Sequence, residues 1–324
     1  MTGAGSVDAL VDAGGPRLAA LMERVERRLG ELAAGHGETL SQHAGATIAA
    51  GGKRLRPLLV FLAAGDAADD PERLVRAAVA VELIHSASLV HDDVLDHAPL
   101  RRGAPTVMAA AGRKIAIATG DLLFSRAFAE LAAGGEMQDV AALSAATSDL
   151  AAGELVQRAD AWQVDVPLKR YLHRCELKTG SLFEASCRLG ALAASGPATA
   201  LAAFGRRIGL AFQLLDDVLD VAGPPSRTGK ARGTDLLDGT VTLPLILARS
   251  RDPQLAALDL RSVRTAAEAD SVCQAVAATG ALEEAKAQAL AVVADAIADL
   301  PGDLPSSQRQ TLELVAEGVV ERYA

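Results

Sequence analysis

The sequence predicts an all-α fold, and three observations point to it. Half of the 324 residues are apolar and only 3% are aromatic, and alanine, the strongest helix former, supplies much of the apolar fraction. Apolar residues recur at helical spacing through long segments that short Gly, Pro and Asp breaks interrupt. The sequence shows no convincing run of alternating β-branched residues between hairpin turns. We therefore expect helices that pack closely through small side chains, and no need for strands.

The elements follow in order along the chain. Residues 1–15 are expected to form a flexible leader, and residues 16–324 a single domain. The first helix is expected from Arg17 onward, because apolar residues from Leu18 to Leu29 recur on one helical face, and it ends before the glycines of 35–37. Later helices are separated by breaks rich in Gly, Pro or Asp, at 51–52, 69–71, 99–105, 134–135, 196–197 and 301–305.

The longest irregular stretch is expected over 223–244, where Gly, Pro, Thr, Lys and Asp are mixed. A loop of this length in a compact domain is often a functional lid. A disordered surface loop explains the same composition, and the stretch alone does not decide between the two.

Charge and cysteine content limit the classes of function. The formal net charge of -9 argues against a nucleic-acid partner, which needs a broad basic surface. Cys175, Cys187 and Cys273 form no CxxC pair, which favours reduced thiols in a cytoplasmic protein. The start does not resemble a signal peptide, and no stretch approaches the ~18 uninterrupted apolar residues of a membrane span. We therefore expect a cytoplasmic protein without a membrane span.

The pentapeptide DDVLD occurs twice, at 92–96 and at 216–220, and each copy follows an apolar run. On a helix, the first and last aspartates of each copy lie one turn apart on the same face, where like charges destabilise the helix. A hard divalent cation would offset this repulsion, and Mg²⁺ takes one or two carboxylates together with water and phosphate oxygens. Two facing helices would then hold a metal cluster bridged by a diphosphate. A single copy could equally be a solvated helix end, but two copies disfavour that interpretation.

Nearby histidines do not indicate zinc. His91 and His97 flank the first motif but lie on different helical faces, and the sequence has no Cys/His set with zinc spacing. His85 lies two turns before Asp92 on roughly the same face, and taken alone it is interpreted as a core histidine.

Residues 51–57 (GGKRLRP) place three cations beside an expected helix start. Two glycines give a flexible approach, and Pro57 suits the first helical turn. Because the helix macrodipole is already positive there, these cations favour a bound anion. Backbone N–H groups with Lys53 and Arg56 would form a diphosphate site. A nucleic-acid patch is the alternative, and the acidic remainder of the chain weakens it.

Further polar residues have two interpretations each. The arginines of 101–103 could each bind an anion, or could pair with the aspartates of the first motif. Lys178, followed by Thr179 in an apolar stretch, could bind a ligand or extend along the surface. Gln213 lies one turn before Asp216 and could extend its polar site.

These motifs, with GKARGTDL at 229–236, occur in the order and spacing of one family. From about Leu18 to its end the chain resembles the trans-polyprenyl diphosphate synthase family, and most closely its long-chain members. The resemblance implies an isoprenoid-synthase bundle of helices around a deep central cavity, usually as a homodimer. It also implies condensation of isopentenyl diphosphate with an allylic diphosphate such as farnesyl diphosphate, with three Mg²⁺ ions per active site once diphosphate is bound.

The resemblance implies roles for individual residues. Metal binding would fall to Asp92, Asp96, Asp216 and Asp220. Isopentenyl diphosphate would be bound by Lys53, Arg56, His85 and Arg102. The allylic diphosphate would be bound by Arg101, Lys178, Thr179, Gln213 and Lys230. The catalytic set would comprise Asp92, Asp93, Asp96, Asp216, Asp217 and Lys178. Thr240 stands where the family commonly has Lys, which puts one diphosphate contact in question.

Product length is expected to depend on Ala87 and Ser88, one turn before Asp92. Both are small, and in the family bulky residues there go with short products, so a long-chain product is expected. A bulky floor from another helix would instead give a geranylgeranyl diphosphate synthase. A non-catalytic subunit of a heteromeric synthase and a class I terpene cyclase are further alternatives, which activity of the chain alone and cyclic products would reveal.

Overall fold

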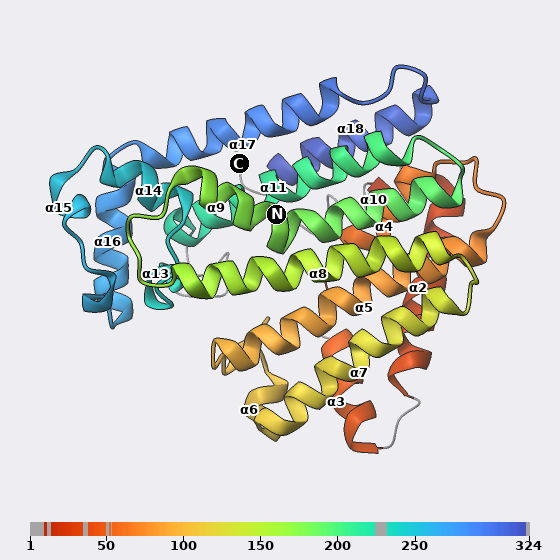
Figure 1. Ribbon diagram of the computed structural model, residues 1–324, viewed down its shortest axis with the longest axis horizontal. Helices are drawn as coiled ribbons and strands as arrows, with labels where there is room; N and C mark the ends of the chain where they lie inside the picture. The colour runs from red at the N-terminus through yellow and green to blue at the C-terminus, as the bar shows by residue number, and fades with distance from the viewer. Residues whose placement is uncertain are drawn as a thin grey trace. The chain divides into compact units, whose positions relative to one another are not determined.

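The computed structural model describes residues 10–11, 14–34, 38–49, 52, 54–223 and 232–321. This part of the chain is almost entirely helical (Figure 1), which confirms the all-α class. Of the leader expected over 1–15, residues 1–9 and 12–13 lie outside the described residues, as do Lys53 and Lys230.

The chain divides into two compact units. Unit 1 comprises residues 1–147, 182–205 and 300–315, and unit 2 comprises 148–181, 206–299 and 316–324. The single domain expected over 16–324 stays a prediction. Three helices contribute several residues to each of the two units: α8 (Met137–Asp160), α11 (Ala198–Ala222) and α18 (Ser306–Glu321).

The remaining elements each fall wholly, or all but one residue, within one unit. Unit 1 contains α2 (Gly15–Ala33), α3 (Glu38–Ala49), α4 (Leu55–Ala64), α5 (Pro71–Leu95), β1 (Leu100–Arg101), β2 (Ala104–Pro105), α6 (Val107–Ala111), α7 (Arg113–Ala132) and α10 (Ser181–Ala193). Unit 2 contains α9 (Leu168–Cys175), the π-helix η1 (Glu176–Gly180), α13 (Thr234–Leu237), α14 (Leu243–Arg249), α15 (Pro253–Ala256), the 3-10 helix η2 (Leu260–Ser262), α16 (Ala266–Ala278) and α17 (Ala281–Ala298).

Helix α5 forms the core of unit 1 and ends at the first aspartate motif. It begins where the Asp70 side chain accepts hydrogen bonds from the backbone N–H groups of Glu72 and Arg73, with Pro71 in the first turn. It packs along α7 over much of its length (Figure 1). In the described residues α5 is the one helix long and apolar enough to cross a membrane, but 78% of its most apolar window is buried within the protein. This burial is typical of a helix in the core of a protein.

Glycines allow the closest helix contacts in unit 1. A Cβ on Gly190 of α10 would overlap the carbonyl oxygen of Val60 on α4 and lie 3.1 Å from the amide nitrogen of Ala64. A Cβ on Gly120 of α7 would overlap the ring of His91 on α5. Interiors are packed without spare volume, so these positions determine how closely α4 and α5 approach their neighbours.

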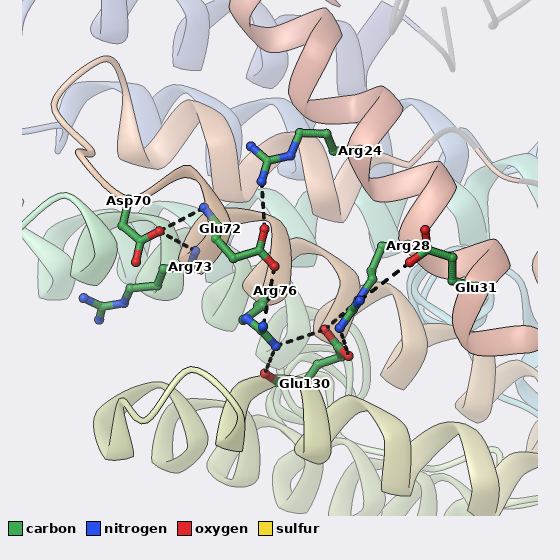
Figure 2. Close-up of polar contacts among 8 residues, drawn as sticks. All are labelled: Arg24, Arg28, Glu31, Asp70, Glu72, Arg73, Arg76 and Glu130. Atoms are coloured by element: carbon green, nitrogen blue, oxygen red, sulfur yellow. Dashed lines mark hydrogen bonds and ion pairs between the residues drawn. The ribbon is translucent and has the colours of Figure 1, made fainter. Parts of the chain in front are cut away.

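A network of ion pairs joins α2, α5 and α7 within unit 1 (Figure 2). Its centre is Glu130 of α7, which is buried. Its carboxylate accepts a hydrogen bond from Nη2 of Arg28 on α2 at 3.0 Å, and Nη1 of Arg76 on α5 lies 3.6 Å away. Solvent and salt screen a buried pair less than a surface pair, so these contacts hold the three helices in place. The other members shown are Arg24, Glu31, Asp70, Glu72 and Arg73.

Two local expectations need correction. Of the irregular stretch expected over 223–244, residues 224–231 lie outside the described residues, and the described remainder is not irregular throughout, because α13 forms within it and α14 already begins at Leu243. Gly233, with φ 73°, lets the chain turn so that its N–H donates to the carbonyl of Asp220 at 3.0 Å. A minimal hairpin also forms, since Leu100 pairs with Pro105 and Arg101 with Ala104.

Candidate functional site

The first aspartate motif occupies the C-terminal end of α5 in unit 1. Asp92 is partly exposed, Asp96 is exposed, and Asp93 between them is only 4% exposed. Nε of Arg101 donates to Oδ1 of Asp93 at 2.7 Å. The helical period therefore turns the first and last carboxylates toward solvent and the middle one inward. Of the two interpretations of Arg101, the structure shows pairing with an aspartate.

The β1–β2 hairpin places Arg102 beside the GGKRLRP segment. Arg102 adopts left-handed backbone angles, with φ 53°, and Gly103 follows with φ 79°. A Cβ on Gly52 would lie 3.1 Å from Nη1 of Arg102. The absence of a side chain on Gly52 thus makes room for this guanidinium.

Arg54 has a structural role that sequence reasoning missed. It precedes α4 with left-handed backbone angles, φ 48° and ψ 35°. Its guanidinium pairs with Glu26 of α2, with Nε to Oε1 at 2.5 Å, and with the buried Glu82 of α5, with Nη1 to Oε1 at 2.8 Å. These carboxylates offset the cation beside a helix start. Glu82 lies ten residues before Asp92, but nothing in the sequence indicated which cation it would meet.

Arg56 and His85 lie in the same electropositive region of unit 1. Arg56 stacks over the ring of Phe183 at 4.8 Å, and its Nε is buried without a hydrogen-bond partner among the described residues. Burial, and to a smaller extent the charge of Arg102, lowers the pKa of Arg56 to about 10. Burial, with the charges of Arg56 and Arg102, places the pKa of His85 well below 6.5. The structure therefore brings together three of the four residues predicted to bind isopentenyl diphosphate, and the fourth, Lys53, lies outside the described residues.

Replacing His85 with glutamine is expected to reduce the loss of stability at acidic pH. His85 is neutral in the folded chain, but in the unfolded chain it takes a proton as the pH falls below 6.5. Its contribution is thus complete above pH 6.5 and is lost toward the lower pKa of the folded chain, at up to about 1.4 kcal/mol per pH unit. Urea unfolding of both proteins from pH 7.5 to about 5 measures this. Parallel pH profiles would contradict the prediction.

The second aspartate motif lies on α11 within unit 2 and repeats the pattern of the first. Asp216 is exposed, Asp220 is partly exposed, and Asp217 is 3% exposed. Asp217 accepts hydrogen bonds from Tyr171 Oη at 2.5 Å and from Gln213 Nε2 at 2.7 Å. Burial, together with the neighbouring carboxylate of Asp235, raises the pKa of Asp217 to about 8. Tyr171 was not identified from sequence, because a tyrosine eight residues before Thr179 carries no signal of this contact.

Lys178 and Thr179 lie on the π-helix η1, which follows α9 directly. Such wide turns are rare and often occur at functional sites. Thr179 Oγ1 donates to Gln213 Oε1 at 2.7 Å, and Lys178 Nζ pairs with Glu154 of α8. A Cβ added to Gly153, the residue before Glu154 on α8, would lie 2.6 Å from the backbone nitrogen of Lys178. Lys178, Thr179 and Gln213 are thus gathered within unit 2, and Lys230 lies outside the described residues.

The donor set of each motif fits a hard divalent cation. Each motif turns two carboxylates toward solvent, one helical turn apart, which matches the one or two carboxylates that Mg²⁺ takes from protein. Within the described ranges, no three His, Cys, Asp or Glu side chains gather closely enough to hold a metal on their own. Each pair would therefore leave coordination positions for water and phosphate oxygens.

Comparison with known proteins places these features in one family. The polyprenyl synthetase family matches residues 37–279. The chain belongs to this family. Component 2 of the heptaprenyl diphosphate synthase of Geobacillus stearothermophilus is 42% identical over 274 residues, covering 83% of this chain and 84% of that protein.

Solved structures agree over nearly the whole chain. A decaprenyl diphosphate synthase from Rhodobacter capsulatus has a TM-score of 0.88 at 32% identity, covering 98% of this chain and 99% of that one. A polyprenyl synthase from Caulobacter crescentus CB15, complexed with calcium and isoprenyl diphosphate, has a TM-score of 0.86 at 33% identity, covering 98% of each chain. The polyprenyl synthetase described here is therefore a prenyltransferase with the fold expected from its sequence.

Proposed function

We propose that this synthetase condenses isopentenyl diphosphate head to tail with an allylic diphosphate, such as farnesyl diphosphate, to give a long-chain all-trans polyprenyl diphosphate. The proposed product length rests on one observation. Ala87 and Ser88, which precede Asp92 by about one turn of α5, are both small and buried. Relatives named for heptaprenyl and decaprenyl products support the same choice. A geranylgeranyl product is the alternative within this enzyme class.

The metal is proposed to be Mg²⁺, three ions per active site once diphosphate is bound, with Asp92, Asp96, Asp216 and Asp220 as ligands. When bound, Mg²⁺ draws electron density from the diphosphate and assists cleavage of the allylic C–O bond. The calcium in the Caulobacter crescentus structure supports a divalent cation of this kind. Asp93 and Asp217, whose carboxylates face inward, are proposed to belong to the same catalytic set.

The cationic side chains are proposed to hold the two diphosphates. In unit 1, Arg56, His85 and Arg102, together with Lys53, would bind isopentenyl diphosphate. Arg56 offers a buried Nε that lacks a partner among the described residues, which suits a multiply charged anion.

The allylic diphosphate is proposed to bind Lys178, Thr179 and Gln213 of unit 2, with Lys230 and Arg101. These residues fix the allylic diphosphate while its C–O bond breaks and the double bond of isopentenyl diphosphate attacks. The released pyrophosphate then accepts the proton, so this scheme requires no nucleophilic side chain. Thr240 offers a hydroxyl where the family commonly has a lysine.

We infer that the chain acts in the cytoplasm as a homodimer. The resemblance to the family supports the homodimer, and the exposed apolar side chains of Ile117 on α7 and, separately, Leu155 on α8 could be covered by a partner. The similarity to a protein named as component 2 keeps a second, different subunit as the alternative.

Replacing Ala87 with phenylalanine is expected to shorten the product. The ring would stand one turn before Asp92 and block the path of a growing tail. Mass analysis of products from the variant and from Ala87→Val, a graded control, measures the effect, with thermal unfolding to confirm that both variants fold. An unchanged product distribution in a folded Ala87→Phe protein would show that the tail runs elsewhere.

The proposed function is tested by incubating the purified chain with farnesyl diphosphate, excess isopentenyl diphosphate and Mg²⁺, followed by mass analysis. Products that end at six or more isoprene units would support the long-chain assignment. Products that end at four units would make the enzyme a geranylgeranyl diphosphate synthase. Failure to extend any allylic starter would favour a subunit that needs a partner.

A further inference from the structure

Tyr171 belongs to a continuous series of hydrogen bonds inside unit 2. The residue is fully buried on α9, and its hydroxyl donates to Oδ2 of Asp217 at 2.5 Å. Oδ1 of the same carboxylate accepts from Nε2 of Gln213 at 2.7 Å. Oε1 of Gln213 accepts from the hydroxyl of Thr179 at 2.7 Å. The chain thus runs from Tyr171 through Asp217 and Gln213 to Thr179.

The donor and the acceptor are defined at each of these hydrogen bonds: Tyr171 and Gln213 both donate to Asp217, and Thr179 donates to Gln213. Each oxygen of Asp217 accepts one hydrogen bond, Oδ2 from Tyr171 and Oδ1 from Gln213, so the amide of Gln213 turns its NH₂ group toward Asp217. The amide oxygen then faces Thr179 and takes the proton of its hydroxyl. The lone pairs of Thr179 Oγ1 remain available for a further donor, and its backbone N–H belongs to the wide turn of η1. Tyr171 therefore influences a side chain that it does not touch.

Asp217 depends on Tyr171 for its orientation. The carboxylate is almost completely removed from water, and a buried acceptor that loses a donor bears a desolvation cost or rotates toward another partner. Rotation would release the amide of Gln213 to flip. The Tyr171 ring itself is fixed separately, because Arg174 lies 5.2 Å from it and donates to the carbonyl of Val241.

We propose that Tyr171 is a positioning residue for the allylic diphosphate site: its hydroxyl fixes Asp217, and through Asp217 and Gln213 it orients the hydroxyl of Thr179. This inference rests on the proposed function, in which Thr179 and Gln213 bind the allylic diphosphate. Tyr171 contacts neither substrate. Its influence is restricted to the allylic site, because no residue in the chain of hydrogen bonds belongs to the set proposed for isopentenyl diphosphate.

The test uses Tyr171→Phe in the full chain, which removes the hydroxyl and keeps the ring. We expect KM for the allylic diphosphate to rise about tenfold, while KM for isopentenyl diphosphate changes less than about twofold. Calorimetric titration with inorganic pyrophosphate and Mg²⁺ should show a similar weakening without any turnover. Ser186→Ala is the matched control, since it removes a buried hydroxyl that donates to the carbonyl of Leu182, and it should change neither constant.

A double-mutant cycle separates positioning from a general loss of structure. If Tyr171 acts through Thr179, its substitution should have little effect on allylic KM once Thr179 is already valine. Asp217→Asn, which replaces one of the two accepting oxygens with an NH₂ group, should reproduce the change in allylic KM and provides a second route if Tyr171→Phe folds poorly. Equal increases in both KM values, or additive effects in the cycle, would overturn the proposal. A wild-type chain that neither extends an allylic starter nor binds pyrophosphate would instead overturn the proposed function, and this role of Tyr171 with it.

Discussion

Replacing either Asp92 or Asp216 with alanine is expected to reduce kcat at least about a thousandfold, the equivalent of about 4 kcal/mol of transition-state stabilisation. Both carboxylates face solvent at the head of their motifs, so their loss removes a proposed metal ligand without opening the core. The helical content and unfolding temperature should remain close to those of the wild type. Steady-state rates at saturating Mg²⁺, with circular dichroism, measure the two effects.

The matched control is Asp303→Ala, which removes an exposed carboxylate from the turn between α17 and α18. It should retain wild-type kcat. Near-normal turnover in Asp92→Ala or Asp216→Ala would remove that residue from the metal site. A loss of helical content with the loss of rate would show that the aspartate supports the fold instead.

Replacing Gly190 with valine is expected to destabilise the protein by about 3 kcal/mol or more, at the upper end of the cost of overpacking a core. Even the Cβ atom would overlap the carbonyl oxygen of Val60 and lie 2.9 Å from its carbonyl carbon. These are backbone atoms of α4, so relief requires α4 and α10 to separate. Urea unfolding followed by circular dichroism gives the change in free energy.

Gly30→Ala provides the opposite control. Gly30 lies inside α2, is exposed, and has nothing within 4 Å of an added Cβ. Alanine there should stabilise the chain by up to about 1 kcal/mol through helix propensity. Wild-type stability in Gly190→Val would mean that α4 and α10 approach less closely than the structure shows.

Periodic features could be predicted from sequence because a helix repeats them. The apolar residues from Leu18 to Leu29 predicted α2, whose buried positions are those on the expected face. The 92–96 and 216–220 motifs were placed on helices, as they are in α5 and α11, with Asp96 as the C-cap of α5. The three cysteines are free and buried, in agreement with the thiols expected.

Contacts between distant residues could not be predicted, because they depend on which helices become neighbours. The sequence left Arg101 with two interpretations, and only the hairpin geometry brings it to Asp93. Arg54 meets Glu82 across twenty-eight positions, and Tyr171 meets Asp217 across forty-six. Each pair satisfies a buried charge or donor, a requirement that composition and spacing do not reveal.

The π-helix at 176–180 changes the directions in which the side chains before and after it point relative to one another. On a regular helix, successive residues turn by about 100°, so two residues eight positions apart point about 80° away from each other. The wide turn accommodates one additional residue, which reduces the total rotation about the helix axis between Tyr171 and Thr179 by about 100°. The two side chains then point within about 20° of the same direction. Both can therefore reach α11, where Asp217 and Gln213 lie one turn apart. An irregularity in one helix thus brings it into register with the regular helix beside it.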